Sequence, residues 1–113
     1  MIIIKEKIPI AELQKIAKDT FGNLVKAVVD IEKEIMVVGG ELHSDAEALL
    51  LENGSGQQDL WGINIYPDIK TEEWVEFDSM INLRPSQNNL TRGISDSKIQ
   101  KKILDTVNKL IQR

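Results

Sequence analysis

The sequence contains no cysteine and only one histidine among its 113 residues. Without cysteine the chain forms no disulfide, thiolate zinc site or iron–sulfur cluster, and it performs no thiol catalysis. Aromatic residues make up only 4% of the chain. The apolar run at residues 2–4 is followed at once by Lys5. We therefore expect neither a signal peptide nor a membrane-spanning helix, and we expect a cytoplasmic protein with no membrane partner.

The sequence also lacks an excess of basic residues. Its net charge is −4, from 14 basic and 18 acidic residues. Residues 30–78 hold thirteen acidic residues against two lysines, whereas residues 79–113 hold seven basic residues against two acidic ones. Proteins that bind nucleic acids normally carry a basic surplus that neutralises phosphates. We therefore expect no nucleic-acid partner, and an acidic sheet edge beside a basic helix accounts for the uneven charge.

The common catalytic and cofactor motifs are missing. Gly54-Ser55-Gly56 lacks the lysine and the helix that complete a phosphate-binding loop. No Gly-x-Ser-x-Gly motif is present, and neither Ser79 nor Ser86 has a partner base evident in the sequence. We expect no cofactor.

The overall composition is that of an ordinary globular protein. Hydrophobic residues supply 42% of the chain and charged residues 28%, unlike the composition of a disordered chain. The length suits one domain with one core. Because no repeat or linker divides the sequence, we predict a single domain over residues 1–113.

Hydrophobic spacing predicts short elements that are separated by glycine and proline. Pro9 opens a helix and Gly22 ends it. Ser44 and Glu47 have the spacing of a capping box, which predicts a short helix over residues 48–52. A third, amphipathic helix carries an apolar stripe from Ile99 to Ile111. The predicted strands are residues 2–4, 25–31, 35–38, 61–66 and 74–83.

This order of elements predicts an α+β fold. Connections of hairpin length favour a mainly antiparallel sheet. We expect two main helices and one short helix to pack on this sheet, all on one side.

Polar side chains gather on one face of the predicted sheet. If residues 61–66 and 75–84 form a hairpin, their non-core faces lie together. Residues 84–93 follow as a polar loop, and loops of this length are usually functional or mobile. The alternative is that the face and the loop are merely solvated. The candidate ligand- or partner-binding residues are Asn64, Tyr66, Asp78, Asn82, Arg84, Ser86, Gln87, Asn88 and Arg92.

Two arginines flank the amide and hydroxyl groups of this loop, and such a pair can hold a carboxylate or phosphate by bidentate hydrogen bonds. We expect Arg84 to be fixed by a nearby carboxylate, with Asp78 as the first candidate and Glu76 or Asp59 as alternatives. Arg92 has no obvious acidic neighbour, so it is the better candidate for an external anion.

Glu41, His43 and Asp45 recur at every second residue, so on a strand they would share one face. A histidine between two carboxylates can bind a divalent metal or act as a base. Against this, the helix cap at Ser44 interrupts the strand geometry. We therefore expect no metal site and retain these residues as weak candidates.

Three stretches together resemble a known family: EALLLENGS at residues 47–55, DLWGINIYP at 59–67 and EFDSMINLRPSQN at 76–88. The chain resembles small archaeal and bacterial proteins that carry a domain-of-unknown-function label. The likeness runs from about Leu24 to the C-terminal helix. It implies a compact α+β domain and carries over no activity and no catalytic residue.

Two functions follow as hypotheses. The first is a non-enzymatic binding or self-association module that uses the 84–92 loop and the adjacent sheet face, and that forms a homo-oligomer or binds a small anion or a protein. The second is a small enzyme that acts on an anionic, phosphate- or carboxylate-bearing substrate. In that enzyme Arg84 and Arg92 would hold the charge, with Asp78 or His43 as the base.

Overall fold

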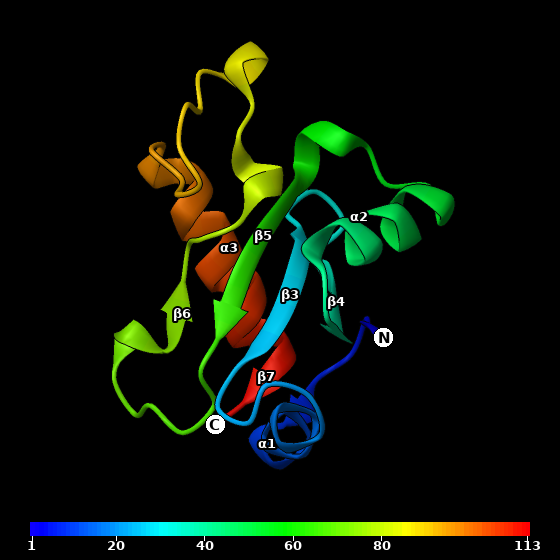
Figure 1. Ribbon diagram of the computed structural model, residues 1–113, viewed down its shortest axis with the longest axis vertical. Helices are drawn as coiled ribbons and strands as arrows, with labels where there is room; N and C mark the ends of the chain where they lie inside the picture. Colours follow the sequence, from blue (N-terminus) through cyan, green and yellow to red (C-terminus); the bar gives the residue numbers. More distant parts are fainter.

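A computed structural model describes all of residues 1–113 and contains three α-helices and seven short strands (Figure 1). The strands are β1 (Ile2–Ile4), β2 (Ile8–Pro9), β3 (Val25–Asp30), β4 (Ile35–Gly40), β5 (Leu60–Ile65), β6 (Val75–Glu76) and β7 (Ile111–Gln112). The helices are α1 (Ile10–Asp19), α2 (His43–Glu52) and α3 (Ser97–Leu110). None of these helices has the length and apolar composition that a membrane crossing requires.

Five strands form the main sheet in the order β1-β4-β3-β5-β6, and every neighbouring pair is antiparallel. The β3–β4 hairpin turns at Glu34, which adopts a positive φ of 56°. A separate two-residue parallel ladder joins β2 to β7 and ties the start of α1 to the end of α3. The predicted α+β fold with a mainly antiparallel sheet is confirmed.

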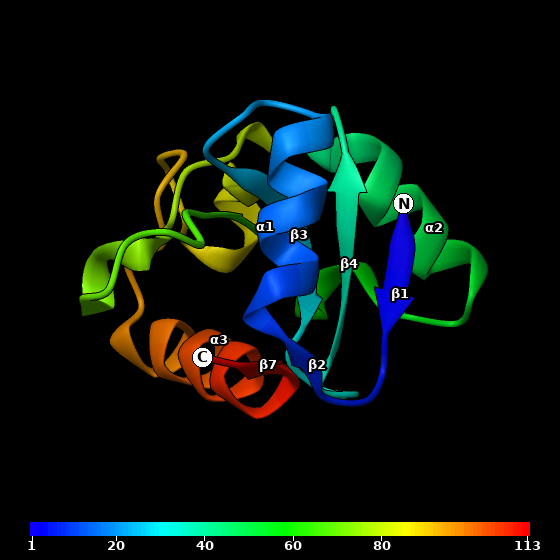
Figure 2. The same ribbon diagram turned by 90° about the horizontal axis from the view of Figure 1, so that it is seen from below.

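Helices cover both faces of this sheet, so the expectation that all helices pack on one side is wrong. Figure 1 shows α2 in front of the sheet and α3 behind it, and Figure 2 shows α1 beside α3. Two separate apolar clusters result: a large one under α1 and α3, and a small one under α2 that includes Leu50. The adjacent residues Val28 and Val29 of β3 point into different clusters. Because helices cover both faces of β3, five of its six residues are buried, and the half-buried strand predicted from alternation is wrong.

The helix ends follow the sequence signals in one case and depart from them in another. Gly22 has a φ of 95° and donates its N–H to the Ala17 carbonyl, which ends the α1 turn as predicted. The capping box at Ser44 is wrong, because α2 begins at His43, five residues before the helix predicted over residues 48–52, and its cap residue, Leu42, has no side-chain hydrogen bond. The Glu47 carboxylate instead lies 3.7 Å from buried Arg84.

The predicted strand over residues 74–83 is also wrong, because only Val75–Glu76 pairs with β5. Beyond that point the side chain of Asn82 takes the place of a strand neighbour. Its Oδ1 accepts the Gly62 N–H at 2.8 Å, and its Nδ2 donates to the Gly62 carbonyl at 2.9 Å. Glycine is required here, because a Cβ at this position would lie 2.6 Å from Ser79. A side chain therefore satisfies the sheet edge, and the backbone is free to turn.

The segment after Asn82 is held by a second buried amide. Residues 84 and 89 form an isolated antiparallel bridge. Asn89 Nδ2 donates to the carbonyls of Asn82 and Gly93, and its Oδ1 accepts the Ser95 N–H. The loop at residues 84–93 therefore has a fixed base, where Arg84 and Asn89 are buried, while Leu90 beside this base is exposed.

We predict that Asn82→Ala lowers the free energy of unfolding by about 3 kcal/mol or more. The truncation leaves the buried N–H and carbonyl of Gly62 without partners, and each such group costs about 1–3 kcal/mol. Urea unfolding followed by circular dichroism measures the change, with one cooperative transition as for a single domain.

Ser86→Ala is the matched control in the same segment, because Ser86 is exposed and makes no hydrogen bond. Its change should stay within about 0.5 kcal/mol. An Asn82→Ala protein as stable as this control would show that the amide does not hold the sheet edge.

Candidate functional site

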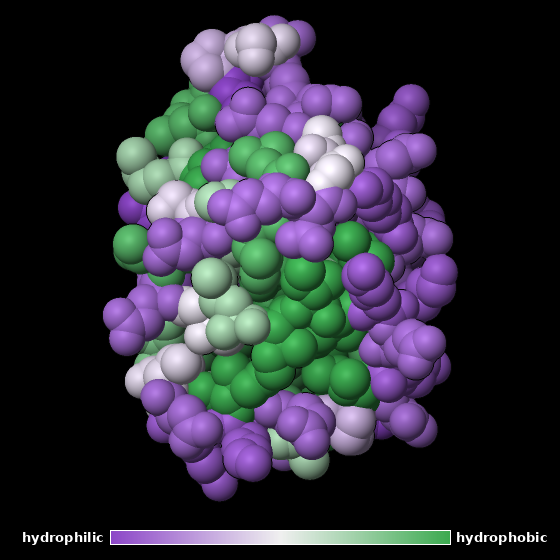
Figure 3. All heavy atoms as spheres, turned by 90° about the vertical axis from the view of Figure 1, so that its right-hand side faces the viewer, coloured by the Kyte–Doolittle hydropathy of each residue, from purple (hydrophilic) through white to green (hydrophobic).

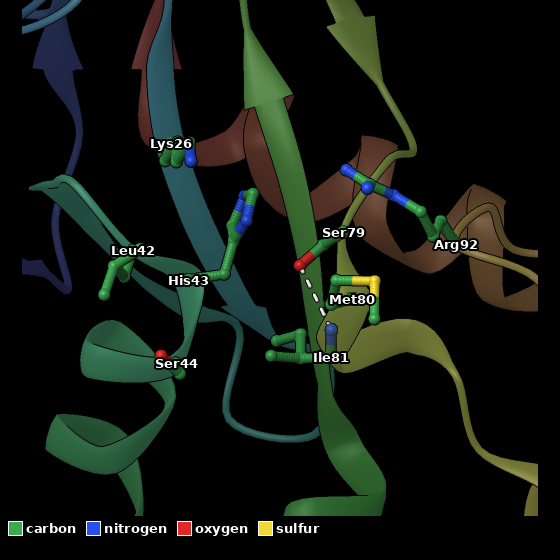
Figure 4. Close-up of a pocket in the computed structure, with 8 residues that line it drawn as sticks. All are labelled: Lys26, Leu42, His43, Ser44, Ser79, Met80, Ile81 and Arg92. Atoms are coloured by element: carbon green, nitrogen blue, oxygen red, sulfur yellow. Dashed lines mark hydrogen bonds between the residues drawn. The ribbon is translucent and has the colours of Figure 1, made fainter.

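A hollow of about 160 Å³ opens between β3, the start of α2 and the segment after β6 (Figure 4). We call it the α2 pocket. Figure 4 shows the His43 ring and the Arg92 guanidinium group approaching it from opposite sides. The lining residues are Lys26, Leu42, His43, Ser44, Ser79, Met80, Ile81 and Arg92.

A row of polar side chains crosses the sheet beside this pocket. The strand register places Lys26 opposite Asn64, and Asn64 opposite Glu76. Asn64 Nδ2 donates to Glu76 Oε1 at 2.9 Å, and the Tyr66 hydroxyl donates to the same oxygen at 3.2 Å. Desolvation and then the Glu76 charge raise the pKa of Tyr66, so its hydroxyl keeps the proton that it donates. The structure thus brings together Asn64 and Tyr66, two of the candidate residues.

Arg92 has an acidic partner, contrary to the sequence expectation. Its Nε lies 2.7 Å from Asp78 Oδ1. The chain folds back so that the Arg92 carbonyl accepts the Ser79 N–H and Asn82 Nδ2, each at 3.0 Å. This turn places residue 92 beside residue 78 although fourteen positions separate them in the sequence. The pair uses only Nε, so both terminal guanidinium nitrogens remain without a partner.

Arg84 does not pair with Asp78, and it lies outside the α2 pocket. It is buried, with only 8% of its surface exposed. Its guanidinium lies 4.4 Å from the centre of the Trp61 ring and donates to the carbonyls of Gln57, Leu60 and Ile81. Glu47 supplies the ion-pair carboxylate, while Asp59, one of the alternatives expected from the sequence, acts on Arg84 only through its charge. Because carbonyls of its own chain occupy these donors, Arg84 holds the fold together at this point.

The remaining loop candidates also lie away from the pocket. Gln87 accepts a hydrogen bond from Arg84 and donates to the Gln58 carbonyl. Ser86 is exposed, and Asn88 adopts a positive φ of 58° at the end of the 3-10 turn Pro85–Gln87. Of the nine candidate residues, Arg92 lines the α2 pocket, while Asn64 and Asp78 lie next to it.

The weak metal candidates are separated by the helix. Because α2 begins at His43, residues 43 and 45 lie about 200° apart around its axis rather than on one strand face. No group of three histidine, aspartate or glutamate side chains is placed to hold a metal ion. His43 alone of the three lines the pocket.

His43 has one ring nitrogen fixed and one free. Its Nε2 lies 2.8 Å from the Ile63 carbonyl, which only accepts hydrogen bonds, so Nε2 carries the proton. Desolvation is the largest effect on the ring and lowers the pKa of His43. The Ile63 hydrogen bond and the charge of Asp78 oppose this lowering, while the charges of Lys26 and Arg92 add to it. Nδ1 makes no hydrogen bond within the protein, and it is accessible to solvent. At neutral pH the pocket therefore contains a neutral imidazole with a free acceptor nitrogen.

Sequence reasoning missed Lys26 as a site residue. The alternation of residues 25–31 places Lys26 on the polar face, but its neighbours Asn64 and His43 follow only from the strand register and from the start of α2. The side-chain nitrogen of Lys26 lies 5.0 Å from the centre of the Phe21 ring and forms no ion pair or hydrogen bond.

Comparison with protein families finds a match over nearly the whole chain. The model of the family described as "Protein of unknown function (DUF5674)" matches residues 2–110. The chain belongs to this family. Comparisons with curated proteins and with solved structures find no match. For this DUF5674 chain the geometry of the pocket is therefore the basis for a functional argument.

We predict that His43 titrates below the ordinary histidine pKa of 6.5. A histidine with a lowered pKa binds fewer protons in the folded than in the unfolded state, so the folded state loses stability as the pH falls below 6.5. Proton NMR of the single histidine measures the pKa directly. When the pH falls from about 7.5 to about 5.5, the free energy of unfolding measured with urea should decrease more for the parent than for His43→Gln.

The comparison with His43→Gln removes the contribution of the carboxylates, which both proteins share. A His43 pKa at or above 6.5 would contradict the prediction, as would equal acid sensitivity of the two proteins.

Proposed function

We propose that this protein is a binding module that holds a small anion, a carboxylate or a phosphate, in the α2 pocket. The observation that carries this proposal is the convergence of Lys26, His43 and Arg92 from three separate parts of the chain onto one hollow. Lysine and arginine are the residues that hold such anions in proteins.

The cationic donors of the pocket are available to a ligand. Lys26 forms no ion pair, and the terminal nitrogens of Arg92 are free beside the Asp78–Nε contact. Arg84 offers the contrast, because carbonyls of the same chain occupy its donors. The first-turn N–H groups of α2 add partial positive charge, since no side chain caps that helix.

The size of the pocket limits what it holds. Sites for drug-sized molecules have volumes of about 300–1,000 Å³, and the α2 pocket has about 160 Å³. A single carboxylate or phosphate group fits this space, either as a free ion or as the charged end of a larger molecule. The apolar lining by Leu42, Met80 and Ile81 would contact the remainder of such a molecule.

An enzymatic function of the same pocket is the second candidate, and His43 favours it. A neutral imidazole with a free nitrogen is a suitable general base beside a bound anion. Recovery of the bound ligand unchanged after prolonged incubation with the protein, followed by NMR, would favour the binding module. Conversion that His43→Gln abolishes would favour the enzyme.

We predict that phosphate and acetate shift the NMR signals of His43 and Arg92 at low ionic strength, where screening is weakest. Lys26→Ala and Arg92→Ala should each weaken this binding by about tenfold, because each removes one of two cationic donors. Arg92→Ala should change the free energy of unfolding by less than about 1 kcal/mol, since the side chains of Arg92 and Asp78 are 56% and 42% exposed.

Lys102→Ala is the matched control, because Lys102 is an exposed lysine on α3, across the sheet from α2. It removes the same charge and should leave binding unchanged. The proposal fails if neither anion binds, or if Lys102→Ala weakens binding as much as Lys26→Ala does.

Self-association is supported by a different part of the molecule. β1 forms one edge of the sheet, contains neither charge nor proline, and Ile2 is 53% exposed. Figure 3 shows an apolar patch with a polar rim on the side where the N-terminal strand and α2 lie. The Met1 side chain lies against Gly40. An unprotected apolar edge pairs readily with another strand, and the partner we propose is β1 of a second copy, in antiparallel orientation.

We predict that sedimentation velocity shows a dimer that dissociates on dilution. Ile2→Lys should abolish this dimer, because a charge on an edge strand opposes pairing. Leu90→Lys makes a similar change at a 71% exposed residue of the distant loop and should leave it intact. A protein that stays monomeric up to about 1 mM would exclude self-association at this edge.

A further inference from the structure

The groups that line the α2 pocket differ in hydrogen-bonding capacity. Lys26 and the free end of Arg92 only donate. Nδ1 of neutral His43 only accepts, because the Ile63 carbonyl fixes the proton on Nε2. A bare anion such as acetate or sulfate offers acceptors alone, so it would satisfy the two cations and place a lone pair against Nδ1.

The His43 ring cannot easily exchange the roles of its nitrogens. Its backbone is the first residue of α2, and its Nε2 is anchored at 2.8 Å on β5. Turning the ring would leave the Ile63 contact without its donor. Desolvation also keeps the pKa of His43 low, which opposes a second proton on the ring. The acceptor at Nδ1 is therefore a fixed feature of the pocket at neutral pH.

We infer that the ligand of the α2 pocket is a small oxyanion that carries its own O–H donor. Two sources share this chemistry: a 2-hydroxy carboxylate, and hydrogen phosphate. In each, the anionic oxygens face Lys26 and Arg92 while the O–H donates to His43 Nδ1. This inference rests on the proposed anion-binding function and narrows it to one class of ligand.

The same arrangement disfavours amino acids. An α-ammonium group also donates a hydrogen bond, but it would add a positive charge to a pocket where the two cations, Lys26 and Arg92, outnumber the one adjacent carboxylate, Asp78. Like charges in a partly desolvated pocket repel each other. A hydroxyl group supplies the donor without that charge.

Two matched ligand pairs test the inference on the unchanged protein. Glycolate and acetate differ by one hydroxyl, and hydrogen phosphate and sulfate are both tetrahedral, while only the first keeps a proton at neutral pH. We expect the hydroxyl-bearing member of each pair to bind about tenfold more tightly, as measured by calorimetry or NMR titration. One hydrogen bond to a fixed acceptor accounts for a difference of this size. A larger affinity ratio for glycolate over acetate indicates a 2-hydroxy carboxylate as the ligand, and a larger ratio for hydrogen phosphate over sulfate indicates hydrogen phosphate.

His43→Gln provides the matched variant. The glutamine Nε2 still reaches the Ile63 carbonyl, but no atom remains at the position of Nδ1. We expect this variant to lose the preference for glycolate over acetate and for hydrogen phosphate over sulfate, so the test is the ratio of the two affinities within each pair and not the affinity for acetate or sulfate itself. Circular dichroism establishes that the variant is folded.

The outcomes separate the two proposals. Equal binding within each pair by the parent overturns the inference and leaves the anion site intact. A preference that persists in folded His43→Gln overturns it as well. If no member of either pair binds, the proposed anion-binding function fails instead. Should glycine bind as tightly as glycolate, the donor at the ligand is not a hydroxyl and the inference also fails.

Discussion

The contact between the Asn82 amide and the Gly62 backbone determines how the second half of the molecule is built. One side chain supplies both the acceptor and the donor that a neighbouring strand would have given to β5. The sheet edge is closed after only two residues of β6, so the chain can turn away. The same Asn82 nitrogen also donates to the Arg92 carbonyl at 3.0 Å. A sheet-edge interaction therefore sets the position of Arg92, and with it one wall of the α2 pocket.

The two arginines of the polar segment show how burial decides the role of a side chain. Arg84 is enclosed between Trp61 and several carbonyls, where an unpaired charge would be costly, and its donors are occupied by the chain itself. Arg92 lies in an exposed pair with Asp78 and keeps its terminal donors free. The same residue type eight positions apart therefore stabilises the fold at one site and faces a pocket at the other.

Local patterns predict much of the fold, because their partners lie within a few residues. The α+β class, the left-handed turn at Gly22 that follows α1 and the apolar stripe of α3 follow from spacing alone. Residues 74–83 do alternate between apolar and polar, but they do not continue as a strand. The Asn82 side chain binds the backbone of Gly62 instead, and because Gly62 lies twenty residues away, local spacing gives no sign of this contact. Pairing Arg84 with Asp78 fails for a similar reason. The sequence does not distinguish Glu47 from Asp78 as a partner for Arg84. Glu47 lies next to Arg84 because α2 crosses over the sheet.

His43 is the residue at which the fold and the proposed chemistry meet. The sequence suggests it only as a weak metal ligand, because on a strand it would share a face with two carboxylates. The early start of α2 separates it from those carboxylates and brings its ring to the Ile63 carbonyl. That one hydrogen bond fixes the tautomer of a partly buried ring, so its other nitrogen is an oriented acceptor in a pocket that two cations also line. The character of the pocket therefore depends on where a helix begins, a boundary that spacing alone places five residues too late.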